Sequence, residues 1–142
     1  MIAISISKKK GIPKTNVQSA TLIENFGIEG DAHAGNWHRQ ISFLASESID
    51  KMRQAGLPNL RPGAFAENIT TEFIDIPNLQ IGSKIKIGAE TELEITQIGK
   101  ECHSKCAIFF TVGDCVMPRE GIFAKVIKSG RIFVGDDVQI IN

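Results

Sequence analysis

Three cysteines in the C-terminal half of the chain carry the strongest chemical signal in the sequence. Cys102 and Cys106 are four residues apart, so a helix or a strand would bring both to one side, and Cys115 follows nine residues later. A thiolate is the reactive form in nucleophilic, sulfur-transfer and soft-metal chemistry, and nearby cations favour it. Lys100, His103 and Lys105 supply such cations. The alternative for each cysteine is a small buried apolar side chain.

Zinc binding is the competing chemistry for this cluster. Cys102, His103, Cys106 and Cys115 offer up to four ligands, and His33 and His38 lie farther upstream. The cluster contains no Cys-x-x-Cys pair, and its spacing fits no common zinc module. A chain of 142 residues also buries a sufficient core without a metal. We therefore expect no structural zinc.

A second cluster of polar side chains lies in the glycine-rich stretch 27–40. Arg39 offers a bidentate fork to an anion, and His33 and His38 can donate hydrogen bonds to an anion or a polar heterocycle. Trp37, the only tryptophan, could cover such a site. We expect Asp31 to orient a basic side chain or a backbone turn, because an exposed carboxylate would repel a phosphate. The alternative is a turn whose polar side chains bind the local backbone.

Two further stretches contain candidate site residues. In residues 63–71, Glu67 and Asn68 stand beside a β-branched run. Glu67 is either a buried carboxylate or the partner of an arginine at one end of the fold. In residues 117–121, Arg119 follows Cys106 closely and is the most plausible basic residue for an anionic ligand. Surface pairing of Arg119 with Glu120 is the alternative.

Short strands dominate the elements that must position these groups. Alternating or β-branched residues predict strands over 2–6, 17–23, 40–44, 84–87, 93–97, 132–134 and 138–141. We expect a hairpin at 88–90 and pairing of the last two strands around 135–137. Residues 121–130 fit either a helical stripe or a buried strand, and we favour the strand. One helix is predicted over 47–55, with Ser46 as its cap and Gly56 as its stop. This pattern favours a mainly β fold closed into a barrel with a few short helices.

Composition limits the classes of function. The 142 residues form one domain, 1–142, and 16 Lys+Arg balance 16 Asp+Glu, so a general nucleic-acid binder is not expected. No apolar run approaches the ~18 residues of a membrane helix. The short apolar start is followed by Lys8, Lys9 and Lys10, which reverses the charge order of a signal peptide. We expect a cytoplasmic protein without a membrane partner, and the sequence does not predict its oligomeric state.

Taken in order, these motifs resemble the MOSC domain, named for the C-terminal domain of molybdenum-cofactor sulfurases. The resemblance spans residues 2–141. It rests on the stretches 27–33, 63–71, 81–88, 104–106 and 135–136. It implies a closed β-barrel, with Cys106 as the signature cysteine that carries sulfur or ligates the molybdenum of the pterin cofactor. Lys105 stands where the eukaryotic cofactor-binding members have arginine, and the chain is similar to the short, stand-alone bacterial members.

The resemblance implies a role in molybdenum-cofactor metabolism. In the first hypothesis, Cys106 carries sulfur as a persulfide from a cysteine desulfurase or another sulfur donor, or binds molybdenum through its thiolate. The second hypothesis is a binding module without catalysis that holds molybdopterin or its precursor through His33, Arg39 and Arg119. The third is a small molybdenum-dependent reductase of N-hydroxylated compounds, which needs an electron-donating partner. We predict that Cys106, His33 and Arg39 line one pocket, with Arg119 close by.

Overall fold

The computed structural model describes residues 1–10, 12, 14–99 and 120–141. In chain order, its elements are β1 (Ala3–Ile6), β2 (Thr15–Val17), β3 (Ser19–Ile23), β4 (Gly27–Ile28), β5 (Ile41–Ala45), α1 (Ser46–Gln54), β6 (Ile69–Thr71), the 3-10 turn η1 (Ile76–Asn78), β7 (Lys84–Ile87), β8 (Thr91–Ile98), β9 (Ile122–Lys128), β10 (Gly130–Phe133) and β11 (Val138–Ile141). The fold is therefore mainly β, as the sequence predicts.

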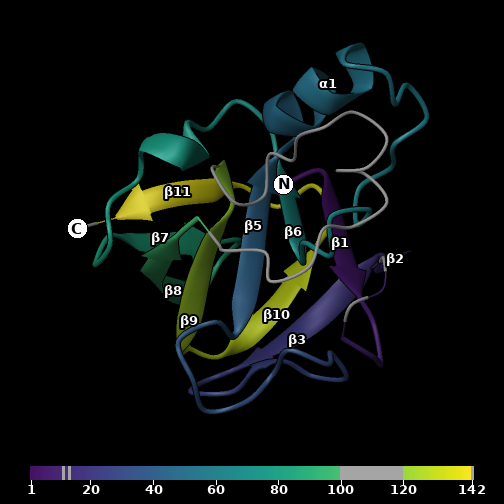
Figure 1. Cartoon of the computed structure of the whole chain (residues 1–142). Coiled ribbons are helices and arrows are strands. Elements are labelled where there is room, and N and C mark those ends of the chain that lie inside the picture. Colours follow the sequence, from purple (N-terminus) through teal and green to yellow (C-terminus); the bar gives the residue numbers. More distant parts are fainter. Residues whose placement is uncertain (11, 13, 100–119, 142) are drawn as a thin grey trace.

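The strands form two sheets around one core (Figure 1). The larger sheet has eight strands in the order β11-β7-β8-β9-β5-β6-β1-β2, and the smaller has three in the order β10-β3-β4. Only the β5–β6 pair is parallel among the described strands. Both sheets contribute buried side chains to one apolar cluster, with Leu22, Ile28 and Ile132 from the smaller sheet and Ile41, Ile85 and Leu93 from the larger.

The expected closed barrel is not found among the described residues. No described pairing joins the two edge strands of the larger sheet, β11 and β2. Strand β10 follows β9 directly, but β9 already pairs with β8 and β5, and β10 pairs with β3 in the smaller sheet. The result is a curled open sheet flanked by a short three-stranded one.

Several strands agree with the hydrophobic pattern of the sequence. In β7 and β8, Ile85, Ile87, Leu93 and Ile95 are fully buried and alternate with more exposed residues. The two strands pair antiparallel across residues 88–90, which confirms the hairpin. Residues 122–128 form β9, so the strand interpretation of this stretch is also correct.

Two expectations about strand organisation are wrong. The single strand expected over 17–23 is divided at Gln18 into β2, which pairs with β1, and β3, which pairs with β10. The last two strands do not pair with each other, because β10 joins β3 and β11 joins β7. Pairing β10 with β3 buries Ile132 completely in the shared core.

Helix α1 covers one end of β5. It buries Ile49 and Met52 against Leu44, Phe65 and Phe123. Ala45, not the expected Ser46, is the N-cap residue, and it has no side-chain cap. At the other end Gly56 has φ of +134°, its N–H donates to Arg53, and the N–H of Leu57 donates to Met52. This Schellman-type ending confirms Gly56 as the stop. No helix among the described residues is long and apolar enough to cross a membrane.

Candidate functional site

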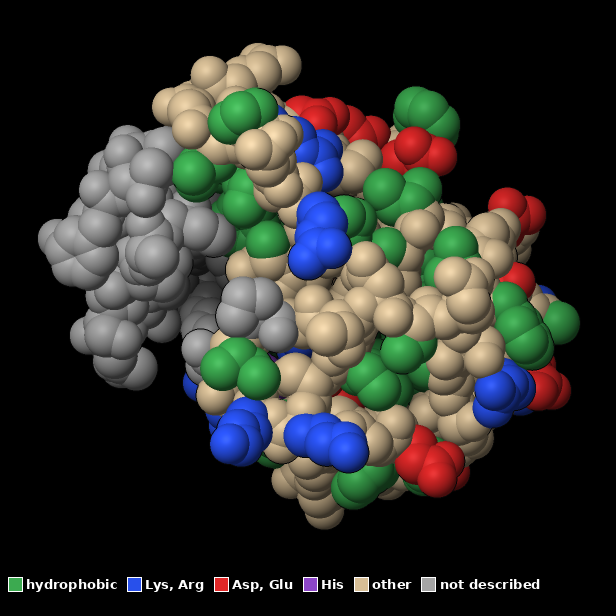
Figure 2. Space-filling view, turned by 90° about the vertical axis from the view of Figure 1, so that its right-hand side faces the viewer, with side chains coloured by type: hydrophobic (Ala, Val, Ile, Leu, Met, Phe, Trp, Pro, Cys, Tyr) green, Lys and Arg blue, Asp and Glu red, His purple; other side chains and the backbone are tan. Residues whose placement is uncertain are grey.

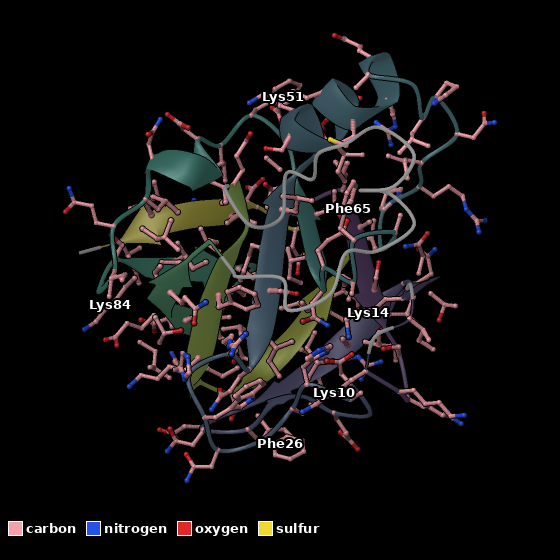
Figure 3. The ribbon with its side chains drawn as sticks, viewed as in Figure 1. Lys10, Lys14, Phe26, Lys51, Phe65 and Lys84 are labelled. Atoms are coloured by element: carbon pink, nitrogen blue, oxygen red, sulfur yellow. The ribbon has the colours of Figure 1, made fainter. Side chains whose placement is uncertain are left out.

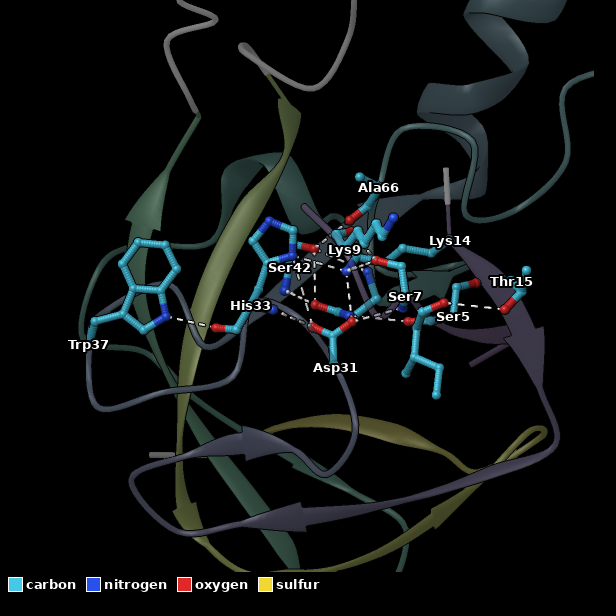
Figure 4. A network of polar contacts seen from close by, with 12 residues as sticks. Ser5, Ser7, Lys9, Lys14, Thr15, Asp31, His33, Trp37, Ser42 and Ala66 are labelled. Carbon is cyan, nitrogen blue, oxygen red and sulfur yellow. Dashed lines mark hydrogen bonds and ion pairs between the residues drawn. The ribbon is translucent and has the colours of Figure 1, made fainter. Parts of the chain in front are cut away.

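A buried ion pair lies at the centre of the candidate site (Figure 4). The Nζ of Lys14, just before β2, donates to Oδ1 of Asp31 over 2.7 Å and to Oγ of Ser7 over 3.2 Å. Nζ also lies 2.9 Å from Nδ1 of His33. The side chains of Lys14 and Asp31 are both fully buried. A buried charge requires such partners, because burial in an apolar interior is costly for an unpaired ion.

Asp31 also fixes the backbone around it. Its Oδ1 accepts a hydrogen bond from the N–H of Ser7, and its Oδ2 accepts one from the N–H of His33. The carboxylate thus ties the end of β1 to the loop that follows β4. This arrangement matches the expectation that Asp31 orients a basic side chain. The sequence does not single out Lys14, because burial of a lysine leaves no mark in the local sequence pattern.

Trp37 brings two cations to the same loop. Its Nε1–H donates to the carbonyl of His33 over 2.8 Å. Nζ of Lys10 lies 5.1 Å from the centroid of the Trp37 ring, and Cζ of Arg39 lies 5.2 Å from it. Both distances are within the range of attractive cation–π contacts. Since His33 and Arg39 both contact Trp37, the structure brings these two predicted site residues together.

The guanidinium of Arg39 has an unused donor. Cζ of Arg39 lies 5.7 Å from the ring centroid of Phe123 as well as over Trp37. Among the described residues, no atom accepts a hydrogen bond from its buried Nε–H. An unsatisfied buried donor costs about 1–3 kcal/mol. A bound acceptor would remove this cost.

The basic side chains of the site lie at one side of the molecule. Figure 3 shows Lys10 and Lys14 near the ends of β1 and β2, whereas Lys51 lies on α1 and Lys84 at the far side of the larger sheet. In Figure 2, which views the side carrying β1 and β2, Lys and Arg side chains are present at several places on the surface. Asp and Glu side chains are present on the same side, so the two signs of charge are interspersed here.

Glu67 and Asn68 are structural residues in this part of the fold. Both are fully buried. Glu67 accepts hydrogen bonds from the N–H groups of Gly63 and Phe65 and from the hydroxyl of Thr70. Burial raises the pKa of Glu67, and these hydrogen bonds oppose that rise. Glu67 is therefore a buried carboxylate, the first of the two alternatives given by the sequence. Among the described residues its partners are backbone N–H groups and a hydroxyl, and no arginine pairs with it.

Asn68 holds two strands in register. Its Oδ1 accepts from the N–H and the hydroxyl of Ser42, and its Nδ2 donates to the carbonyl of Ser5. Both the oxygen and the nitrogen of the side-chain amide are therefore engaged in hydrogen bonds. Asn68 thus connects β5 to β1.

The loop that Glu67 shapes also positions Lys14. The carbonyl of Gly63 accepts a hydrogen bond from the N–H of Lys14 over 2.9 Å. Gly63 has φ of +96°, and a Cβ on it would lie 2.5 Å from the carbonyl oxygen of Lys14. Glycine is therefore required for this close approach. Residues 63–68 act as a support for the Lys14 ion pair.

Cys106, Lys105 and Arg119 lie outside the described residues, as do Cys102 and Cys115. The described residues that flank this segment are close to the loop. The N–H of Gly99 donates to the carbonyl of Gly121 over 2.7 Å, so the two ends of the segment are adjacent. Gln97 contacts Nε2 of His38 through Oε1 over 2.9 Å and donates through Nε2 to the carbonyl of Gly99.

The described residues offer neither a metal site nor a groove at His33 and Arg39. The described residues contain no group of three or more His, Cys, Asp or Glu side chains that could hold a metal ion. Two open grooves, of about 500 and about 410 Å³, are lined by residues 14–16, 59–62 and 64 and by residues around α1 and Phe73. Lys14 lines the first groove, but its ammonium is engaged with Asp31. Neither groove contains His33 or Arg39 in its lining.

Comparisons with known proteins agree with this architecture. The MOSC domain model matches residues 30–139. Among solved structures, the YuaD protein from Bacillus subtilis is similar, with a TM-score of 0.80 and 19% identity over 97% of this chain and 92% of that one. YiiM from Escherichia coli has a TM-score of 0.72 and 15% identity over 99% of this chain and 68% of that one. YiiM from Geobacillus stearothermophilus has a TM-score of 0.73 and 17% identity, covering 99% and 74%. A search of curated proteins found no significant match.

Proposed function

Since the chain belongs to the MOSC domain family, we propose that it serves molybdenum-cofactor metabolism as a sulfur carrier, with Cys106 as the persulfide-forming residue. The observation that supports this proposal is the loop that carries His33, Trp37 and Arg39, in which the buried Nε–H of Arg39 has no acceptor among the described residues and is suited to an anion. Gln97 and Gly99 connect this loop to the start of the segment that contains Cys106.

The sulfur-transfer step is balanced without an external oxidant. The thiolate of Cys106 attacks the terminal sulfur of a persulfide on the donor enzyme. The new S–S bond forms on Cys106 while the S–S bond of the donor breaks, and the donor cysteine leaves as a thiolate. Thiolate is the nucleophile in such exchanges. Lys105 and His103 are sequence neighbours whose positive charge would favour the thiolate.

The described residues fit the anionic part of a pterin cofactor. Arg39 has a buried Nε–H without an acceptor in the described chain, and Lys10 brings a second cation to Trp37. These groups, with His33, would hold the phosphate of molybdopterin or of its precursor. When bound, the cofactor supplies a molybdenum centre whose ligands can include sulfur. The residues of this chain supply the anion site and the thiolate.

Sulfur loading tests the carrier role directly. The protein is incubated with a purified cysteine desulfurase and cysteine, and bound sulfane sulfur is located by mass spectrometry of the intact chain and its peptides. We expect the wild type to gain one sulfur atom on Cys106 and Cys106→Ser to gain none. Cys115→Ser is the matched control and should load like the wild type. Equal loading of Cys106→Ser and wild type would overturn the proposal.

A second candidate function is anion binding without catalysis, favoured by the unpartnered Nε–H of Arg39 in the described chain. The pH dependence of thiol alkylation separates the two candidates. A carrier thiol should react with an apparent pKa clearly below the ~8.5 of a free cysteine. An ordinary or unreactive Cys106 thiol would favour the binding module. Metal and pterin analysis of protein purified from its own host would identify the ligand in either case.

A further inference from the structure

The smaller of the two grooves lies between helix α1 and the segment that joins β6 to η1. It has a volume of about 410 Å³. Three parts of the chain line it, namely the end of β5 with the first half of α1, residues 73–75, and Glu120 before β9. Figure 3 marks its α1 side with Lys51. A groove of this size can hold several side chains of a partner.

Negative charge dominates the lining of this groove. Its charged side chains are three carboxylates and one ammonium. Nζ of Lys51 donates to Oε1 of Glu120 over 2.9 Å and to Oε2 over 3.0 Å, so these two charges balance each other. Neither Glu47 nor Asp75 forms an ion pair within the described chain. A positively charged occupant would complement these two carboxylates.

Phe73 adds an apolar surface to the same groove. It is 89% exposed, the largest fraction among the large apolar residues of the described chain. Its backbone has φ of +62°, which a bulky side chain rarely adopts and which costs about 1–2 kcal/mol. Its N–H donates to Oε2 of Glu47 over 2.8 Å, which ties this residue to α1. Neither the strained backbone nor the exposed ring stabilises the isolated fold.

An aromatic ring beside carboxylates is complementary to a guanidinium group. Arginine stacks its planar cation on an aromatic face, and its N–H donors bind a carboxylate in pairs. The stacking contact already occurs twice within this chain, since Arg39 lies over Trp37 and Arg131 over Phe133. Lysine pairs with a carboxylate as a point charge and lacks the planar fork. The groove therefore suits an arginine better than a lysine.

We propose that this groove is a docking site for an arginine-bearing segment of a partner protein, with a guanidinium over the ring of Phe73 and its donors on Glu47 and Asp75. Glu47 contributes its charge and also ties Phe73 to α1. The proposal goes beyond sulfur carriage and does not depend on it, because it uses no cysteine and no residue of the loop at 31–39.

Binding of a defined peptide to the full chain tests the proposal. The probe is a fluorescein-labelled peptide of alternating arginine, leucine and glycine, and fluorescence anisotropy at low ionic strength measures its Kd. Two comparison peptides carry lysine or the uncharged isostere citrulline in place of each arginine. We expect saturable binding of the arginine peptide, about fivefold weaker binding of the lysine peptide and none of the citrulline peptide. No saturable binding, or a comparison peptide that binds as tightly, would overturn the proposal.

Two variants locate the binding surface. Phe73→Asn removes the ring and keeps the loop, because asparagine tolerates a positive φ. Glu47→Gln/Asp75→Asn removes both charges, and the new amide at position 47 can still accept from the N–H of Phe73. We expect each variant to raise the Kd for the arginine peptide about tenfold, equivalent to about 1.4 kcal/mol.

Matched controls remove the same groups elsewhere. Phe26→Ser removes a partly exposed ring at the opposite end of the molecule from Lys51 in Figure 3. Glu92→Gln/Glu94→Gln removes two carboxylates of β8, which do not line the groove. Both controls should bind the arginine peptide like the wild type. Equal losses of affinity in the groove variants and the controls would overturn the assignment to this surface.

Other occupants of the groove give different readouts. We expect the free wild type to sediment as a species that Phe73→Asn leaves unchanged. A dimer that Phe73→Asn abolishes would assign the groove to a second copy and overturn the proposal. Displacement of the peptide by an equal concentration of free arginine would overturn the docking of a protein segment. Failure of sulfur loading at Cys106 with intact peptide binding would overturn the carrier function and leave this surface unaffected.

Discussion

Two buried carboxylates near the candidate site are stabilised in different ways. Asp31 is paired with the ammonium of Lys14, and its charge is balanced by an opposite charge. Glu67 instead accepts from two backbone N–H groups and the hydroxyl of Thr70. Burial raises the pKa of Glu67 above its ordinary value of 4.5, with the hydrogen bonds acting in the opposite direction. The charged form of Glu67 therefore costs stability in the folded protein.

This difference predicts how stability depends on pH at Glu67. A raised folded-state pKa means that the folded protein holds the proton more tightly than the unfolded chain. The stabilisation that comes from protonated Glu67 is complete below the ordinary pKa of 4.5. It is lost as the pH rises through the raised pKa of the folded protein. Glu67→Gln has no such titration. Urea unfolding between pH 4 and pH 8 should therefore show the wild type losing free energy of unfolding relative to the variant as pH rises. A constant or opposite difference would contradict the assignment.

Arg39 should contribute to binding at the expense of stability. Its buried Nε–H lacks an acceptor in the described chain, so replacing the side chain removes an unsatisfied donor. We expect Arg39→Met to keep or slightly raise the free energy of unfolding, by up to about 1 kcal/mol, while the Kd for inorganic phosphate rises at least tenfold.

Arg131 provides a matched comparison for this prediction. It also lies over an aromatic ring, that of Phe133, but its guanidinium donates to Thr21 and Ser19. Arg131→Met should leave phosphate affinity unchanged. Calorimetric titration and urea unfolding of both variants measure the two effects. Equal loss of affinity in the two variants would indicate a general charge effect instead of a specific contact.

At the scale of elements, the loop before β6 holds the start of β2 in place. Gly63 accepts from the N–H of Lys14, donates to Glu67, and leaves no room for a side chain beside the Lys14 backbone. The stretch 63–68 thus determines where the Lys14 ammonium lies. Glu67 and Asn68 in this stretch hold the surrounding backbone through their side-chain hydrogen bonds.

This support predicts a strong effect of Gly63→Ala. A Cβ at this position would lie 2.5 Å from the Lys14 carbonyl oxygen, and φ is +96°. We expect a loss of about 2–4 kcal/mol from backbone strain and the close contact together. Gly135→Ala is the control, because Gly135 also has φ of +96° but has nothing within 4 Å of an added Cβ. It should lose only the strain, about 1–2 kcal/mol. Similar losses in urea unfolding would contradict the role of the contact.

The elements also show which features a sequence can predict. Strands β7 and β8 follow from alternation alone, because one face of each is buried and the turn between them is short. The partner of β10 does not follow, since β3 lies more than one hundred residues earlier and local pattern contains no information on that pairing. Asp31 was predictable as an orienting group. Lys14 was not identified, because a buried lysine has the same sequence signal as an exposed one.

At the scale of the whole molecule, the described part of the candidate site is assembled from four segments within the N-terminal third of the chain. Ser7 follows β1, Lys14 precedes β2, His33 follows β4 and Arg39 precedes β5. Asp31 joins the first three of these segments, and Trp37 joins the last two. The open, curled sheet is sufficient for this convergence, so the site does not depend on closure into a barrel.

The final prediction concerns the placement of Cys106 in this assembly. The hydrogen bond between Gly99 and Gly121 brings the two ends of the cysteine-bearing segment together, and Gln97 connects that point to His38. We therefore expect an anion held by Arg39 and His33 to shield the Cys106 thiol. Inorganic phosphate should slow alkylation of Cys106 by iodoacetamide severalfold in the wild type and have no effect in Arg39→Met. Peptide mass spectrometry measures the rate, with Cys102 and Cys115 as internal references. Phosphate that binds at His33 without changing the Cys106 rate would show that the thiol and the anion site are separate.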